Sequence, residues 1–442
     1  MIKYTEIEAA IGRSTALTPL TQEQIQQWDM MFRSDDHKLA KSGLHIPSSI
    51  CSEVQRLVFA ESEINASDQQ MQQVIDDVLS AMQTKISSAF ALGGMAFKPY
   101  YGNGNIVVDL VRADRFFPVS FDAAGRIQSA VFVEPYRSGN FYYYRLEYHE
   151  YDPQKHTASV SNYTFRSDNE NSLGFPCSLE DTPTWANLQP VTIFEHVNAP
   201  LFSYFKIPKQ NVVNPDSPLG VSVYADAAAQ IMQADQIWNS IMWEYQSKEN
   251  KILASGDFFD PNGKLSGIER RLFMKTERND ESPFFNIYSP EIRETSYFKC
   301  LNEIIQHIES TCGFAVGTLS HAENVEKTAT ELRISKQRSY TLISSIQKSL
   351  QYALQQLADA ALLIMQYYDI PCSSAQITCN WGDSVLEDVG ENFSREIELM
   401  RIGALKPEIL LMHYYRCSEE EAKNMMPPEP KESDFSLYGG RI

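Results

Sequence analysis

One segment in the last third of the chain constrains the fold most, because its helix signal runs from Thr328 to about Asp369. Thr328 and Glu331 have the spacing of a capping box, in which two side chains satisfy free backbone groups at a helix start. Apolar residues follow at three- and four-residue steps or their multiples, and Pro371 predicts the end. These apolar positions are Leu332, Ile343, Ile346, Leu350, Leu354, Leu357, Ala361 and Ile364. A helix of this length measures about 60 Å, so the sequence predicts an elongated subunit or an assembly.

The first 92 residues are predicted to be helical. Thr21 with Gln24, and Ser67 with Gln70, have capping-box spacing. Apolar residues after Ser67 follow helical steps up to Gly93, a residue type that commonly ends helices.

From Met95 to about Tyr204 the pattern becomes strand-like. Residues 116–121 and 127–133 flank a turn and predict a hairpin, and further strands are predicted over 141–151 and 159–165. Helical and strand-rich sections therefore follow one another, which predicts an α+β fold.

Two further helices are predicted behind the Pro- and Gly-containing stretch 215–220. The first covers about 221–250, or roughly 40 Å, and the second covers 297–312. Between them lies a mixed section, 251–296, in which short strands are predicted at 251–254 and 284–288. Residues 313–327 are predicted to form a loop.

The tail that follows Pro371 is predicted to contain more short helices. Pro407 suits the first turn of one helix, and Ser418 with Glu421 has capping-box spacing.

The charge of the chain bears on its partners. Lys and Arg number 38 against 57 Asp and Glu, so the formal net charge is −19. Tight binding of nucleic acid over a broad surface is disfavoured, because phosphate contacts dominate such affinity. The acidity serves solubility, or it keeps a surface near DNA from adhering to it. Composition does not choose between these two interpretations.

The cysteines and apolar runs bear on the compartment. Seven scattered cysteines without a CxxC pair argue against a disulfide framework or zinc site and fit a reducing compartment. The N-terminus has no apolar core of a signal peptide, and no apolar run is long enough to span a bilayer. Assembly in a cytoplasm is therefore expected.

Motifs for catalysis are missing from the sequence. Lys327 and Thr328 lack the glycine cradle of a Walker A loop, and Gly102-Asn103-Gly104 is predicted to be a hairpin turn. No HExxH or GxSxG pattern occurs, and His307 and His321 are interpreted as surface or packing residues. We therefore predict no catalytic residue, metal site or cofactor.

Two other groups of side chains have open interpretations. Trp238, Met242 and Trp243 are predicted to pack against a neighbouring helix, with an interface between like subunits as the alternative. The most basic short stretch comprises Arg270, Arg271, Lys275 and Arg278. It is either a solvated face or a docking surface for an acidic partner.

Five stretches, in this order, resemble the portal proteins of tailed bacteriophages, of the type found in siphoviruses of Gram-positive bacteria. They are Ala91-Leu92-Gly93-Gly94-Met95-Ala96-Phe97-Lys98-Pro99-Tyr100, Ala113-Asp114-Arg115-Phe116-Phe117-Pro118, Tyr144-Arg145-Leu146-Glu147-Tyr148-His149, Ser217-Pro218-Leu219-Gly220-Val221-Ser222-Val223-Tyr224 and Lys327-Thr328-Ala329-Thr330-Glu331. The likeness extends over roughly residues 90–370.

The resemblance implies an elongated portal subunit made of named parts. These are the wing (1–220), two stem helices (221–250 and 297–312), the clip (251–296), the tunnel loop (313–327), the long helix from wing to crown (328–370), and the crown with the C-terminal tail (371–442). Such subunits form a ring, usually of twelve, at one vertex of the capsid.

The resemblance also implies function and partners. The ring is a structural conduit for DNA packaging and ejection, it is not an enzyme, and it needs no cofactor. Its partners would be the major capsid protein, the terminase large subunit, a head–tail connector and the double-stranded DNA passing through, with no membrane involved. The protein would be assembled in the bacterial cytoplasm and reside in the virion.

Two sets of residues are the expected contacts. The tunnel-loop residues expected to face DNA are His321, Glu323, Asn324, Glu326 and Lys327. The expected partner surface of the clip is Arg270, Arg271, Lys275 and Arg278. Because twelve copies would carry roughly −230 before counterions, contacts with DNA are expected to be weak and salt-sensitive.

Two rival interpretations remain at this point. One is another ring protein of a phage-like particle, such as a head-completion adaptor, although such chains are much shorter. The other is a carboxylate-based metal-dependent nuclease or hydrolase. Asp257 and Asp260 illustrate the carboxylates available to it, and a solvated loop is the simpler interpretation of that pair.

Overall fold

A computed structural model describes the chain over residues 1–33, 43–102, 104–212, 214–247, 251–255, 273–276, 285–288, 294–321, 329–382, 389–415 and 419–426. Helices and sheets are both present, which confirms the α+β class. The chain forms two compact units, Met1–Trp381 and Gly382–Ile442.

Four helices precede the sheets of the larger unit. They are α1 (Tyr4–Ile11), α2 (Pro19–Arg33), α3 (Ile46–Phe59) and α4 (Gln69–Leu92). A short strand, β1 (Glu63–Ala66), interrupts the helical region that was predicted for the first 92 residues. It pairs antiparallel with β14 (Ile377–Asn380), more than 300 residues away, so no local pattern indicates it.

The helix starts differ from the predicted capping boxes. Helix α2 begins at Pro19, and the hydroxyl of Thr18 accepts a hydrogen bond from the backbone N–H of Thr21. Helix α4 is capped by Asp68, whose side chain accepts from the N–H of Gln70. Both predicted boxes are therefore wrong. Proline is favoured at the first helical position, and aspartate is as good a cap as serine.

Helix α4 buries its predicted apolar stripe completely. Met71, Val74, Val78, Met82, Ile86 and Phe90 are all buried. The helix ends at Gly93, whose φ of +89° lies in the left-handed region. Gly93 also touches the backbone of Gly220, since a Cβ on Gly93 would stand 2.5 Å from the Gly220 carbonyl oxygen.

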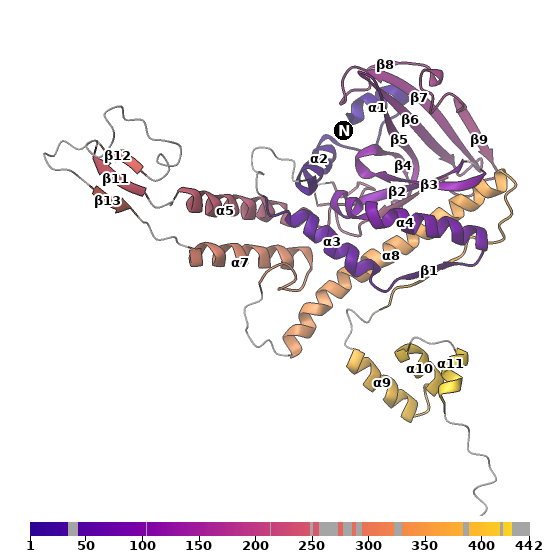
Figure 1. The fold of residues 1–442 in the computed structure, drawn as a ribbon. Coiled ribbons are helices and arrows are strands. Elements are labelled where there is room, and N and C mark those ends of the chain that lie inside the picture. The colour runs from indigo at the N-terminus through magenta and orange to yellow at the C-terminus, as the bar shows by residue number, and fades with distance from the viewer. Residues whose placement is uncertain are drawn as a thin grey trace, which may run out of the picture. The chain divides into compact units, whose positions relative to one another are not determined.

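Two sheets follow α4 (Figure 1). The smaller has the order β10-β2-β3 and consists of β2 (Gly94–Gly102), β3 (Asn105–Arg112) and β10 (Ser203–Lys206). The larger has the order β4-β5-β6-β7-β8, with β9 also paired to β7. Its strands are β4 (Phe116–Phe121), β5 (Ile127–Ser138), β6 (Phe141–Asp152), β7 (Thr157–Ser167), β8 (Phe175–Pro176) and β9 (Val191–Glu195). The predicted hairpin and the two further strands are confirmed.

An aromatic core joins the two sheets. Phe116 from β4 stacks on Tyr204 from β10, with ring centroids 5.0 Å apart. Phe132 from β5 packs edge-on against Phe202 at 5.4 Å. Such pairs add to the stabilisation that comes from burying apolar area.

The long helix is confirmed as α8 (Ala329–Tyr367), 39 residues or about 58 Å. Seven of its eight predicted apolar positions, from Ile343 to Ile364, are buried, and the side chain of Leu332 lies outside the described residues. Strands β2 and β10 and helix α3 cover this stripe, so partners for it come from the same chain.

The predicted helix pair is present as α5 (Ala228–Ser247) and α7 (Glu294–Cys312), which contact each other. Helix α5 begins seven residues later than the predicted start at 221. Residues 221–224 instead run along the end of α4, where the N–H of Val223 donates to the carbonyl of Phe90 at 3.0 Å. A 3-10 turn, Ala225–Ala227, then leads into α5.

A small three-stranded sheet occupies part of the mixed section. It consists of β11 (Lys251–Ser255), β12 (Phe273–Thr276) and β13 (Phe285–Tyr288), in the order β12-β11-β13. The strands predicted at 251–254 and 284–288 are confirmed, and β12 was missed. Strand β12 lies parallel to β11, while β13 is antiparallel to it.

The described residues of the second unit form the helices α9 (Val389–Arg401), α10 (Pro407–Tyr415) and α11 (Glu419–Met425). Helix α10 starts at Pro407 as predicted, whereas Ser418 lies outside the described residues. Phe393 and Tyr414 join α9 to α10, with ring centroids 4.6 Å apart. No helix among the residues described in either unit is long and apolar enough to cross a membrane.

Replacing Gly93 with alanine should lower the free energy of unfolding by about 3 kcal/mol. The new Cβ would strain the left-handed backbone of residue 93 and overlap with the backbone of Gly220. Gly12 is the matched control, because it also ends a helix at positive φ but has open space around it. Gly12→Ala should cost about 1–2 kcal/mol. Urea unfolding of the two variants measures the difference, and equal losses would contradict the close approach.

Candidate functional site

The paired helices α5 and α7 bury only part of their surface against each other and their neighbours. On α5 the buried side chains include Ile231, Ala234 and Ile241, and on α7 they include Leu301 and Ile308. Spacings of three and seven residues place each set on one helix face.

Trp243 departs from its predicted packing role. Its side chain is 69% exposed, while Trp238 and Met242 from the same helix are half-buried. Phe298 on α7 is also exposed, at 43%. The packing prediction is therefore wrong for Trp243, and the alternative interpretation, contact with a like subunit, stays open for this residue.

Glu309 near the end of α7 organises the turn that follows the helix. Its carboxylate is fully buried and accepts hydrogen bonds from the N–H groups of Gly317 at 3.0 Å and Ser320 at 2.7 Å. It also accepts from the N–H of Leu319 and from the hydroxyl of Ser320, the latter at 2.9 Å. Charge-assisted bonds of this kind are the stronger ones, so a single side chain holds the turn.

Two other contacts place this turn against α8. Helix α7 ends at Cys312, and the φ of +86° at the following Gly313 allows the reversal. The N–H of Phe314 donates to the Glu309 carbonyl at 2.8 Å. The N–H of Ala315 donates to the Ser339 hydroxyl on α8 at 3.0 Å. The chain is thus clamped from Gly313 to Ser320 between the two helices. We call residues 313–320 the Glu309 turn.

His321 stands directly after the Glu309 turn. Its N–H donates to the Asn302 side-chain oxygen at 3.0 Å, and its carbonyl accepts from the Asn302 amide at 3.2 Å. The residue is exposed. Sequence reasoning selected His321 for DNA contact but missed Glu309 and Asn302, which hold its backbone in place.

Most of the other predicted contact residues cannot be placed. Glu323, Asn324, Glu326, Lys327 and also Thr328 lie outside the described residues, as do Arg270, Arg271 and Arg278. Lys275 belongs to β12, where its Cα pairs with that of Ala254.

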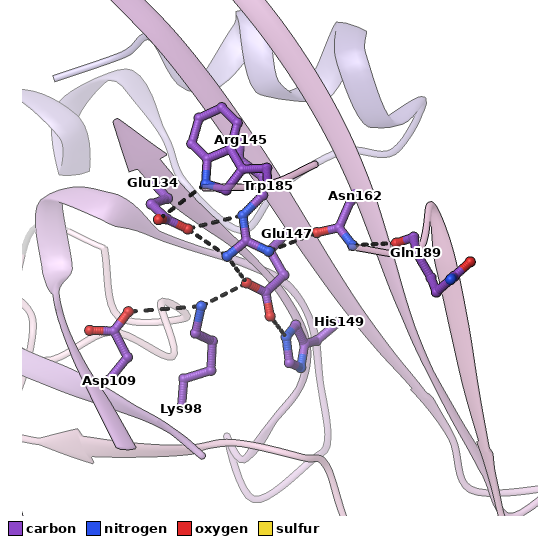
Figure 2. Close-up of polar contacts among 9 residues, drawn as sticks. All are labelled: Lys98, Asp109, Glu134, Arg145, Glu147, His149, Asn162, Trp185 and Gln189. Atoms are coloured by element: carbon purple, nitrogen blue, oxygen red, sulfur yellow. Dashed lines mark hydrogen bonds and ion pairs between the residues drawn. The ribbon is translucent and has the colours of Figure 1, made fainter. Parts of the chain in front are cut away.

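A buried charge cluster links the two sheets of the larger unit (Figure 2). Glu147 on β6 is 8% exposed, and its carboxylate lies 2.7 Å from the ammonium of Lys98 on β2 and 2.8 Å from the guanidinium of Arg145. Its other oxygen is 2.8 Å from the Nε2 atom of His149. Lys98, Arg145, Glu147 and His149 are named the Glu147 cluster below.

Neighbouring groups complete the Glu147 cluster. Glu134 on β5 accepts from Arg145 and from the indole N–H of Trp185, the latter at 3.2 Å. Asn162 on β7 accepts from Arg145 at 3.0 Å and donates to the carbonyl of Gln189 at 2.8 Å. The buried charges are therefore paired and hydrogen-bonded, as burial of charge requires.

The surroundings shift the pKa values of two residues of the cluster, Glu147 and His149. Burial alone would raise the pKa of Glu147, but Lys98, the hydrogen bond with His149 and Arg145 together hold it well below its usual range. Burial lowers the pKa of His149, although the bond to Glu147 opposes that effect. At neutral pH His149 is uncharged, so its Nε2 carries the proton donated to the carboxylate.

Sequence reasoning did not predict this cluster. Arg145, Glu147 and His149 alternate along one strand and so share one sheet face, which is an unusual pattern for a buried strand. That alternation is the available signal, but Lys98 is 49 residues away from Glu147. Among the residues that the structure describes, no three His, Cys, Asp or Glu side chains gather so as to hold a metal ion.

Comparison with known proteins identifies the family. A family model described as phage portal protein, SPP1 Gp6-like, matches residues 55–426. The match spans well over half of the chain, so the chain belongs to this family of phage portal proteins, which are structural components of virions. The resemblance drawn from the five sequence stretches is thereby confirmed. A comparison with curated proteins finds no match.

Glu309→Gln should loosen the Glu309 turn. An amide oxygen keeps one acceptor site but the amide nitrogen then faces N–H groups, which costs about 2 kcal/mol or more. Hydrogen exchange at the amides of Gly317, Leu319 and Ser320 should accelerate by at least about 30-fold. Glu303→Gln, an exposed carboxylate on the same helix, is the control and should leave these amides unchanged. Equal exchange in both variants would remove Glu309 from this role.

Acidification should destabilise the larger unit in two steps. Because the pKa of folded His149 is lowered, the unfolded chain alone gains its proton as the pH falls below about 6.5, and the free energy of unfolding declines. The pKa of folded Glu147 is also lowered, so its contribution is complete above about pH 4.3 and is lost as the pH falls further. Each step approaches about 1.4 kcal/mol per pH unit.

His149→Gln should abolish the first step and keep the second. Urea unfolding between about pH 7 and pH 3 measures both. His307→Gln, an exposed histidine on α7, should retain the profile of the parent chain. A His149 variant that keeps the slope below pH 6.5 would assign that slope to another group.

Proposed function

We propose that this chain is the ring-forming portal subunit at one capsid vertex, usually in twelve copies, through which DNA is packaged and ejected. Membership of the portal family supports the role in general. The observation that carries the proposal further is the Glu309 turn, which joins the helix pair to the long helix and fixes the start of the predicted tunnel loop.

The named parts of a portal subunit are proposed to follow the predicted boundaries. Residues 1–220 form the wing, 221–250 and 297–312 the stem, 251–296 the clip, and 371–442 the crown and tail. The contact of α5 with α7, and the small sheet that lies between them along the chain, agree with a stem that leads to a clip.

The proposed contact with DNA is made by the tunnel loop, residues 313–327. His321 is exposed and its backbone is fixed, which suits a residue at the edge of a channel. A carboxylate-rich chain of net charge −19 repels phosphate, so DNA would slide past with weak and salt-sensitive contacts.

The proposed partners are the major capsid protein, the terminase large subunit and a head–tail connector. Arg270, Arg271, Lys275 and Arg278 would supply the clip with a local basic surface for an acidic partner. Assembly would take place in the cytoplasm of the bacterial host, before the ring is built into the virion.

Electron microscopy of the purified protein tests the ring. Closed rings with a central hole are expected, and retention of a short DNA duplex in gel-shift assays should be weak and vanish as salt rises. A protein that stays monomeric and hydrolyses DNA in the presence of a divalent metal would overturn the proposal. Tight sequence-specific binding of duplex would overturn the sliding contact alone.

A further inference from the structure

A groove of about 930 Å³ lies over the middle of α8. Its walls come from the turn between β4 and β5, the segment around β10, and one face of α8 that includes Tyr352. Tyr352 is 51% exposed at its edge. The volume is in the range of pockets that take a ligand or a short peptide segment.

Lys206, the last residue of β10, is the unusual side chain in this groove. It is half-buried, and burial lowers the pKa of its ammonium group. Its backbone is fixed, because its carbonyl accepts a hydrogen bond from the Ser349 hydroxyl. No described residue supplies a carboxylate or a hydrogen bond to the ammonium within contact distance.

The carboxylates that line the groove are already engaged. Asp122 binds the guanidinium of Arg126 at 2.7 Å and accepts from the backbone of Ala124 at 2.9 Å. Asp359 accepts from the amide of Gln355 at 3.0 Å. Lys206 therefore remains the cation of the groove without a counter-charge.

Two other polar groups in the groove also lack partners. Ser203 is 2% exposed, and its hydroxyl makes no hydrogen bond. The side-chain oxygen of Gln128 is buried and likewise unpaired. Buried polar groups without partners are rare, and each is destabilising unless a further molecule satisfies it.

We propose that this groove receives a carboxylate-bearing segment from a second copy of the chain, with the Lys206 ammonium as its counter-ion. The inference rests on the proposed ring. In a ring of identical subunits each contact joins two different surfaces, so the unpaired Lys206 ammonium in the groove of one copy can meet a carboxylate on the next. Copies of net charge −19 repel one another, and a paired cation at the contact offsets part of that repulsion.

Lys206→Met tests the groove because it should have different effects on the stability of the single subunit and on the formation of the ring. Removing an unpaired, half-buried charge should leave the unfolding midpoint of the dissociated subunit unchanged or raise it. The subunit concentration needed for ring formation should rise at least about tenfold, because the incoming carboxylate loses its counter-ion. Lys85→Met, an exposed lysine on α4, is the control and should change neither quantity.

Carbodiimide cross-linking identifies the occupant, because it joins an ammonium to a carboxylate that it already contacts. Rings assembled from a mixture of ¹⁴N- and ¹⁵N-labelled chains should yield Lys206 peptides linked to Asp or Glu peptides of the other label. Rings of Lys206→Met that form as readily as those of the parent would overturn the inference and leave the ring proposal standing. Links from Lys206 only within one chain, or only to another protein, would also overturn it. Failure of the parent chain to form any ring would instead overturn the proposed function.

Discussion

The carboxylate of Glu147 is the interaction on which the larger unit depends, because it joins two sheets that are built from separate hairpins. It binds Lys98 from the three-stranded sheet while its own sheet supplies Arg145 and His149. A buried ion pair of this kind contributes less to net stability than apolar packing would, yet removing either partner costs several kcal/mol. The Glu147 cluster therefore selects one alignment of the two sheets, and the aromatic core around Phe132 packs in that alignment.

A second buried carboxylate, that of Glu309, fixes the turn that follows α7. Glu309 gathers three backbone N–H groups and a hydroxyl from residues eight to eleven positions further along the chain. The turn that Glu309 fixes contacts α8 through Ser339, so this turn connects the helix pair to the long helix. Lys206 contrasts with both sites, since it is a partly buried charge to which no residue in the described part of the chain offers a partner. Glu147 and Glu309 thus organise the fold, whereas Lys206 is the charge that we propose to act in assembly.

Sequence patterns predicted the elements whose stabilising contacts are periodic and local. The stripe of α8, the stripe of α4 and the β4–β5 hairpin each depend on residues a few positions apart, and all three are found. The predictions failed where contact with a residue far away in the sequence decides the local structure. Strand β1 forms only because β14 returns to it, and the start of α5 is delayed because Val223 bonds to Phe90 at the end of α4. Trp243 was predicted to be packed because aromatic residues in helices generally are, but the helix opposite does not cover it.

The sequence by itself determined the class of the protein, the long helix and the succession of helical and strand-rich sections, because periodicity, turns and ordered motifs are carried by neighbouring residues. Tertiary structure alone decided which charges meet. His321 was chosen from sequence, whereas Glu309 and Asn302, which hold its backbone, became visible only when the chain folded back on α7. Arg145, Glu147 and His149 share a strand face by sequence, but Lys98 completes the cluster from another sheet. Pairing of side chains depends on distances in space, and residues far apart in the chain acquire such distances only through folding.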